Sequence, residues 1–490
     1  MALAVFNTLG GRKEPFEPIT PGRVKMYVCG VTVYDLCHVG HARANVAFDV
    51  IVRYLRYRGY EVTFVRNFTD IDDKIIQRAN REGTGYREIS GRYIEAFYRD
   101  FDRLGLLRPD AEPRATEHIP DIVGLIGRLI EGGMAYAADG DVYYSVREFA
   151  GYGKLSGKKA EELLAGARVE VGERKRDPLD FALWKASKPG EPSWDSPWGA
   201  GRPGWHIECS AMAMKHLGTT FDIHGGGKDL VFPHHENEIA QSEGATGKPF
   251  ARYWIHNGFV NVDNEKMSKS LGNFFTLRDV LEKVKPDVLR FFLASSHYRS
   301  PIDYSDKSLA EAKAGLDRLY RVKEKAEGCA GAGAEATSVP DGEEFAPLRD
   351  APLRFVEAMD DDFNTAAALG RLFDAARALN RLSPADPASD REAAGRFLAG
   401  YAILEPLFDV LGLLRESAQE YFRAEPASAV VAAGAEAGLD EGEILRRIEA
   451  RSAARGRKDF AEADRIRREL ESLGIVLEDS KTGTTWKYKG

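Results

Sequence analysis

The chain has 490 residues, of which 43% are hydrophobic and 29% charged, and its formal net charge is −8. This length allows several domains with cores of their own, and the composition is ordinary for a globular protein. The sequence has no apolar run long enough to cross a membrane, no N-terminal secretion signal, and too few cysteines (four) for a disulfide framework. We therefore expect a cytoplasmic protein with reduced cysteines and no membrane partner.

The N-terminal region predicts a strand–helix–strand unit. Residues 24–29 predict a buried strand that ends at Gly30, residues 40–58 carry apolar side chains at helical spacing, and residues 61–66 predict a second strand. Such a unit forms a parallel sheet, and parallel sheets bind ligands beyond the carboxyl ends of their strands. Cys29 would lie at that edge of the sheet.

The expected fold class is α/β: a Rossmann-like parallel-sheet catalytic domain with an insertion, followed by an α-helical bundle and a small C-terminal module. Changes in composition suggest the boundaries. They are 1–105 and 201–260 for the two halves of the catalytic domain, 106–200 for the connective insertion, 261–308 for a region that begins with a lysine-containing loop, 309–425 for the bundle, and 440–490 for the module.

The sequence His-Val-Gly-His at residues 38–41 suggests a phosphate site. It lies where a loop enters a helix, and there the backbone N–H groups and the helix dipole favour an anion. His38 and His41 can donate hydrogen bonds to phosphate oxygens, and Gly40 lets the backbone approach a ligand closely. Taken alone, the two histidines could equally be surface residues near a helix cap.

The sequence Lys-Met-Ser-Lys-Ser at residues 266–270 is a more specific signal. Lys266 and Lys269 lie in a predicted loop with small neighbours, and lysine carries a compact charge on a flexible stem that can follow phosphate oxygens. The alternative is a solvated basic turn. The sequence contains no P-loop motif that would bind phosphates instead.

Three consecutive glycines at 225–227, followed by Asp229, do not form a dinucleotide-binding fingerprint. They are compatible with adenosine lying against bare backbone while Asp229 bonds the ribose.

In this order, the histidine and lysine motifs resemble the nucleotide-handling pair of class I aminoacyl-tRNA synthetases. Further segments resemble the cysteinyl-tRNA synthetase family, namely residues 67–74, 180–185, 204–210, 232–238 and 361–365. The resemblance therefore covers nearly the whole chain. Val39 stands where isoleucine is commoner in the family, which is a conservative departure.

The resemblance implies a ligase that activates L-cysteine with ATP, supplied with Mg²⁺, and passes it from cysteinyl-adenylate to the 3′-terminal ribose of tRNA(Cys). It implies that His38, His41, Lys266 and Lys269 bind ATP and stabilise the transition state. No protein nucleophile is required, because positioning and electrostatic stabilisation carry the chemistry. We expect a monomer.

The resemblance also implies one zinc ion per chain, held by Cys29, Cys209, His234 and Glu238. From the residues alone, only His234 and Glu238 can be connected, because residues four apart share a helical face; the adjacent His235 is expected to point elsewhere. Without the resemblance, the two cysteines would be interpreted as buried structural residues.

A zinc ion would explain how cysteine is distinguished from serine. A pocket that selects by size rejects a near-isostere only about 10²-fold, whereas zinc prefers sulfur to a hydroxyl oxygen. Because four protein ligands normally close a zinc site, binding of the substrate thiol needs a fifth bond or a loosened ligand, and we expect Glu238 to loosen. Thr69 and Trp205 match family positions that line the cysteine pocket, although a turn residue and a packing residue are the alternatives.

The resemblance implies that residues 261–308 contact the tRNA stem, that the bundle binds tRNA and that the C-terminal module binds the anticodon. Residues 451–468 carry seven basic and three acidic side chains. The anticodon candidates are Arg455, Phe460, Asp464 and Asp479. In isolation, a solvated helix with ion pairs is the favoured interpretation of the charged run, and helix packing that of Phe460.

Two rival functions remain open at this point. One is a related ligase that passes cysteine to the amine of a small sugar-like acceptor, for which a basic terminal module has little use. The other is a noncatalytic RNA-binding relative, which would be expected to lack a motif histidine, a lysine or a metal ligand. All of these residues are present.

Overall fold

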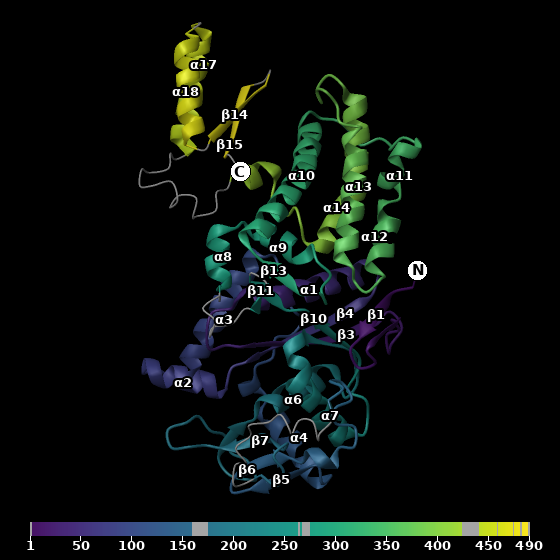
Figure 1. Ribbon diagram of the computed structural model, residues 1–490, viewed down its shortest axis with the longest axis vertical. Helices are drawn as coiled ribbons and strands as arrows, with labels where there is room; N and C mark the ends of the chain where they lie inside the picture. The colour runs from purple at the N-terminus through teal and green to yellow at the C-terminus, as the bar shows by residue number, and fades with distance from the viewer. Residues whose placement is uncertain are drawn as a thin grey trace.

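A four-stranded parallel sheet lies at the centre of the N-terminal half (Figure 1). The computed structural model describes residues 2–158, 175–262, 265–266, 275–423, 441–457, 459–473, 475–480 and 483–488. Within these ranges, no helix is long and apolar enough to cross a membrane. The strand order β10–β9–β3–β4 confirms the predicted Rossmann-like sheet.

The two halves of the sheet come from separate parts of the chain. The first half begins with a small hairpin and contains β1 (Ala4–Asn7), β2 (Arg12–Pro15), β3 (Arg23–Thr32), α1 (Val39–Tyr57), β4 (Glu61–Thr69), α2 (Asp73–Glu82) and α3 (Tyr86–Arg103). The second half contains α6 (Trp205–Leu217), β9 (Phe221–Gly227), α7 (Glu236–Thr246) and β10 (Ala251–Asn257). The predicted strand–helix–strand unit is thus β3–α1–β4, with β3 and β4 parallel.

Strand β3 does not end at Gly30, as the sequence had suggested, but continues to Thr32. Its pairing with β4 is irregular between Val28 and Val31. A Cβ atom at Gly30 would lie 1.6 Å from the carbonyl oxygen of Asn67, so only glycine allows the two strands to approach here. The irregular stretch includes Cys29.

The chain between the two halves forms a separate antiparallel sheet with its own core. It contains α4 (Ile119–Glu131), β5 (Ala135–Ala138), β6 (Asp141–Tyr144), β7 (Phe181–Ala186) and β8 (Gly201–Pro203). Asp73 at the start of α2 binds Lys185 of β7 at 2.6 Å and also pairs with Arg202 of β8. These ion pairs attach the insertion to the catalytic sheet.

Beyond β10, a three-stranded sheet leads into the helical part of the molecule. The connecting region contains β11 (Val260–Val262), β12 (Glu265–Lys266), α8 (Leu277–Lys283), α9 (Pro286–Ala294) and β13 (Ile302–Tyr304). The bundle contains α10 (Asp306–Gly331), α11 (Ala346–Arg349), α12 (Ala351–Met359), α13 (Thr365–Asn380), α14 (Arg391–Leu411) and the short α15 (Ala418–Arg423).

The C-terminal module is a helix pair with a hairpin and a small core of its own. It contains α17 (Glu441–Gly456), α18 (Phe460–Ser472), β14 (Ile475–Ser480) and β15 (Gly483–Tyr488), drawn in yellow in Figure 1. The guanidinium of Arg423 in α15 lies 5.7 Å from the centroid of the Trp486 ring, so the hairpin contacts the end of the bundle.

A buried ion pair joins the catalytic domain to the bundle. Asp49 of α1 and Arg290 of α9 are 3% and 0% exposed, and Arg290 also donates to the carbonyl oxygen of Leu411 in α14 at 2.8 Å. Burial alone would raise the pKa of Asp49, but Arg290 and Arg53 outweigh it and lower that pKa. The carboxylate therefore stays charged and compensates a guanidinium that has no access to water.

We predict that Asp49→Ala lowers the free energy of unfolding by about 3–5 kcal/mol, because it leaves the buried Arg290 charge without its partner. Chemical denaturation followed by tryptophan fluorescence measures the change. Asp102→Ala is the control, because the Asp102–Arg108 pair is about half exposed and such pairs contribute about 1 kcal/mol or less. Equal losses in the two variants would contradict this role of the buried pair.

Candidate active site and metal centre

A cavity of about 460 Å³ opens at the carboxyl ends of β3, β9 and β10. Its walls come from segments far apart in the sequence, and they include six of the residues predicted to form the site: Cys29, His38, Gly40, His41, Trp205 and Asp229. The position agrees with the expectation that a parallel sheet binds its ligand at this edge.

The two motif histidines are held at the start of α1. His38 caps the helix: its Nδ1 accepts the backbone N–H of Gly40 at 3.0 Å, and its own backbone N–H donates to Nδ1 of His41 at 3.2 Å. The two rings stack with their centroids 3.8 Å apart. Because both Nδ1 atoms accept, we assign the proton of each neutral ring to Nε2, which makes each imidazole a donor from that atom.

The described chain that flanks the lysine motif lies near the histidines. Lys266 lies in β12 and pairs with Asn261 of β11, whereas Lys269 lies outside the described residues. After that segment, Thr276 forms a β-bridge with His38, and the N–H of Leu277 donates to the carbonyl oxygen of Cys37 at 2.7 Å. The described chain on both sides of residues 267–274 is therefore fixed close to the cavity.

The three consecutive glycines serve different purposes. Gly227 and Asp229 line the cavity, as an adenosine subsite would require. A Cβ atom at Gly225 would lie 2.3 Å from the Phe48 ring, and one at Gly226 would lie 2.8 Å from the His235 ring. The first two glycines therefore make room for side chains of the protein.

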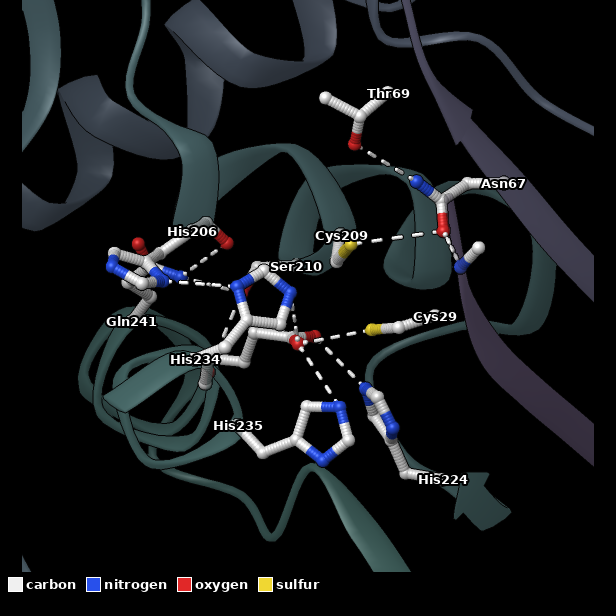
Figure 2. A network of polar contacts seen from close by, with 12 residues as sticks. Cys29, Asn67, Thr69, His206, Cys209, Ser210, His224, His234, His235 and Gln241 are labelled. Atoms are coloured by element: carbon white, nitrogen blue, oxygen red, sulfur yellow. Dashed lines mark hydrogen bonds and ion pairs between the residues drawn. The ribbon is translucent and has the colours of Figure 1, made fainter. Parts of the chain in front are cut away.

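The four predicted metal ligands lie together, and Cys29 among them lines the cavity; Figure 2 labels Cys29, Cys209 and His234 of the four. Their donor atoms are all within 4.8 Å of one another, although they come from β3, α6, a π-helical turn (Val231–His235) and α7. Cys29 Sγ donates to Glu238 Oε1 at 3.3 Å, and His234 Nε2 lies 3.1 Å from the same oxygen. Two thiols, an imidazole and a carboxylate thus form one cluster, in which Cys29 is half-buried and the other three residues are buried.

Sequence reasoning missed two histidines of this cluster. His224 Nε2 lies 2.8 Å from Glu238 Oε2, and His224 and His235 form a second set of possible ligands with Cys29 and Glu238. The expectation that His235 points elsewhere was wrong, because His235 and Glu238 are three residues apart and side chains at that spacing share a helical face; His235 Nε2 lies 3.9 Å from Glu238 Oε1. His224 could be found only from the register of β9 against β3.

The electrostatics of the cluster suit a divalent cation. Burial would raise the pKa of Glu238, but His224 and His234 outweigh it and lower that pKa. Burial, Cys209 and Glu238 raise the pKa of Cys29 well above its usual range, and burial lowers the pKa of His234 to about 3. Neutral imidazoles and thiols that need a positive charge to ionise are a donor set that fits zinc.

The two predicted cysteine-pocket residues differ in position. Trp205 begins α6, is 37% exposed, and stacks on His234 with ring centroids 4.2 Å apart. Thr69 is 2% exposed at the end of β4; it bonds the buried Glu208 and accepts from Asn67 Nδ2 at 3.5 Å. Only Trp205 of the pair lines the cavity within the described chain.

The C-terminal candidates lie on the surface of the module. Arg455 and Asp464 are exposed, Phe460 is 62% exposed at the start of α18, and Asp479 lies in β14, where its side chain is outside the described residues. The alternative of Phe460 as a packing residue is therefore wrong. Ion pairs within α18, such as Arg465–Glu462 at 2.7 Å, agree with the alternative of a solvated, ion-paired helix.

Comparison with known proteins decides the family. The family model of the class I (C) tRNA synthetase catalytic domain matches residues 15–314, a DALR domain matches residues 354–415, and a cysteinyl-tRNA ligase anticodon binding domain matches residues 444–486. The chain belongs to the cysteinyl-tRNA synthetase family. The DALR match lies within the bundle.

Relatives of this family match the chain over its whole length. The cysteine–tRNA ligase of Geobacter sulfurreducens is 59% identical over 502 residues, and that of Trichlorobacter lovleyi is 58% identical over 491 residues; both alignments cover 100% of each chain. The methionyl-tRNA synthetase of Mycobacterium tuberculosis, solved with methionyl-adenylate, shares the fold with a TM-score of 0.62. That alignment is 17% identical and covers 84% of this chain and 96% of the other.

We predict that the purified protein binds a divalent metal ion and that Cys209→Ala loses it, because the change removes one donor from a buried cluster. Elemental analysis by mass spectrometry measures the bound metal. Cys329→Ala is the control, since Cys329 is equally buried but lies in α10 of the bundle. Equal metal contents in the two variants would contradict the assignment.

Proposed function

We propose that the chain makes cysteinyl-tRNA in two steps within this cavity. In the first step, a carboxylate oxygen of cysteine forms a bond to the α-phosphorus of ATP. The bond between that phosphorus and the bridging oxygen breaks, and Mg²⁺-bound pyrophosphate leaves with the electron pair. The observation that carries the proposal is the juxtaposition, in one cavity, of the histidine motif with the Cys29 end of a sulfur-containing cluster.

His38 and His41 act on the phosphates of ATP. Their Nε2–H groups, oriented by the hydrogen bonds at Nδ1, would donate to phosphate oxygens at the start of α1, while Gly40 keeps the backbone accessible. Lys266 and Lys269 would stabilise the charge that develops on the transferring phosphate and the departing pyrophosphate. Asp229 would bond the ribose from the β9 side of the cavity.

The metal cluster selects the amino acid. Cys29, Cys209, His234 and Glu238 would hold a zinc ion, which when bound supplies a soft Lewis acid that prefers a thiolate to a hydroxyl oxygen. The chain would position the amino acid through Trp205, which lines the cavity and stacks on His234, and Thr69 would support the pocket through its bonds to Asn67 and Glu208. The hydrogen bond to His224 would retain the Glu238 carboxylate if it loosened.

In the second step, cysteinyl-adenylate reacts with the 3′-terminal ribose of tRNA(Cys). A ribose hydroxyl oxygen forms an ester bond to the acyl carbon, and the bond from that carbon to the phosphate oxygen breaks. AMP leaves with the electron pair, and the hydroxyl proton passes to the phosphate or to solvent. The bundle and the C-terminal module would hold the rest of the tRNA, with Arg455, Phe460, Asp464 and Asp479 toward the anticodon.

The rival functions explain less of the chain. A ligase for a small amino-sugar acceptor leaves no role for the C-terminal module, which matches an anticodon binding domain. A noncatalytic RNA-binding relative leaves no role for the clustered metal ligands. We further propose that the protein is cytoplasmic and monomeric.

We predict ATP–pyrophosphate exchange that depends on cysteine, with serine slower by about 10²-fold or more, because a metal that prefers sulfur adds to selection by size. The measurement is exchange of labelled pyrophosphate with each of the twenty amino acids in turn. Removing the metal with a chelator should abolish the preference for cysteine over serine, and adding zinc should restore it. Stronger exchange with another amino acid would refute the proposal.

We predict that Phe460→Ala lowers kcat/KM for tRNA charging by about tenfold, because one stacked base is worth about 1–3 kcal/mol, while pyrophosphate exchange is unchanged. Leu445→Ala is the matched control, since Leu445 is an apolar side chain of α17 that is also exposed, at 44%. If both variants charge tRNA as the unmodified protein does, Phe460 does not contact the anticodon.

A further inference from the structure

Lys74 brings a positive charge to the cavity from the edge of the sheet. It is the second residue of α2, which follows the edge strand β4 and projects from one side of the molecule (Figure 1). Lys74 lines the cavity together with Tyr34, and its Nζ lies 5.2 Å from the centroid of the Tyr34 ring. The aromatic face holds the ammonium at the cavity without neutralising its charge.

The carboxylates of Asp72 and Asp73, the residues just before Lys74, interact with other groups. Asp72 caps α2 and accepts the backbone N–H of Lys74 at 2.8 Å. Asp73 pairs with Lys185 and Arg202 of the insertion. Within the part of the chain that the structure describes, the Lys74 side chain forms no ion pair. Its charge is therefore available to a ligand.

The strand order separates Lys74 from the proposed nucleotide subsite. The cavity residues Gly227, Asp229 and Asn257 lie at or just after the ends of β9 and β10, on one side of β3. Lys74 follows β4, on the other side of β3. An ATP molecule that extends from Asp229 to the histidines at the start of α1 would leave the Lys74 end of the cavity for a different phosphate.

We propose that Lys74 binds a backbone phosphate at the single-stranded 3′ end of the acceptor RNA and so positions the terminal ribose for transfer. This inference rests on the proposed ligase function. Sites for single-stranded nucleic acid follow the backbone with positively charged side chains, and Lys74, held over the Tyr34 ring, supplies such a charge at the cavity. Lys74 is thus a positioning residue for the second step and takes no part in the first.

The test separates the two steps in the full-length protein. Lys74→Met should leave cysteine-dependent pyrophosphate exchange within about twofold of the unmodified protein, while transfer from preformed cysteinyl-adenylate to subsaturating tRNA, followed in a single turnover, should slow about tenfold. Lys188→Met is the matched control: it removes the same charge from an exposed loop of the insertion that does not line the cavity, and should change neither step. Lys74→Arg keeps the charge and should restore most of the transfer rate.

Salt dependence gives a readout that a purely structural role would not change. Losing one phosphate contact to a single strand should reduce the slope of log tRNA affinity against log salt concentration by about 0.7 in Lys74→Met, with no change in Lys188→Met. Equal losses of exchange and transfer would overturn the proposal, as would unchanged transfer with an unchanged slope. If the unmodified protein itself failed to charge tRNA with cysteine, the proposed function would fail instead, so the two failures are distinguishable.

Discussion

The buried carboxylate of Glu238 is the constraint on which the arrangement of the site depends. It is 0% exposed, and its ion-pair partners within the described residues are imidazoles, with no lysine or arginine among them. A charge in such a place must be satisfied by hydrogen bonds or by a metal, because desolvation is costly. Cys29 of β3 and His224 of β9 meet this need only in the observed register, since a shift of one residue would turn His224 to the other face of the sheet.

A second constraint holds the helical bundle to the catalytic sheet. The catalytic domain and the bundle share one continuous core, although composition separates them in the sequence. Asp362, in a left-handed conformation with φ 64°, accepts the backbone N–H of Phe6 at 2.8 Å, the Tyr298 hydroxyl at 2.9 Å and Arg299 at 2.6 Å. One buried carboxylate therefore ties the N-terminal hairpin, the chain after α9 and the bundle. A tRNA bound along the bundle would meet the cavity in a fixed orientation.

Local patterns predicted the elements better than the contacts between them. The helix expected at residues 40–58 is α1, and the two flanking strands are β3 and β4, because apolar periodicity depends on neighbouring residues alone. One error arose where the backbone is irregular, since strand β3 continues through a bulge beyond Gly30. The other neglected the three-residue spacing that puts His235 on the same helical face as Glu238. Helix packing was the favoured alternative for Phe460 in isolation, but its exposed position at the start of α18 depends on the folded module and not on residue type.

The sequence by itself determined the chemical groups: a pair of histidines at a helix start, a lysine motif, and residue types that bind a soft metal. It also determined the family, because these motifs keep their order along the whole chain. Only the tertiary structure decided that Cys29 and His224 both reach Glu238, since a parallel sheet joins strands β3 and β9, which are far apart in sequence. The tertiary structure also decided that the charge of Lys74 lies unpaired at the cavity within the described residues. The neighbouring Asp73 pairs with Lys185 and Arg202 instead, and these ion pairs depend on how the insertion packs against α2.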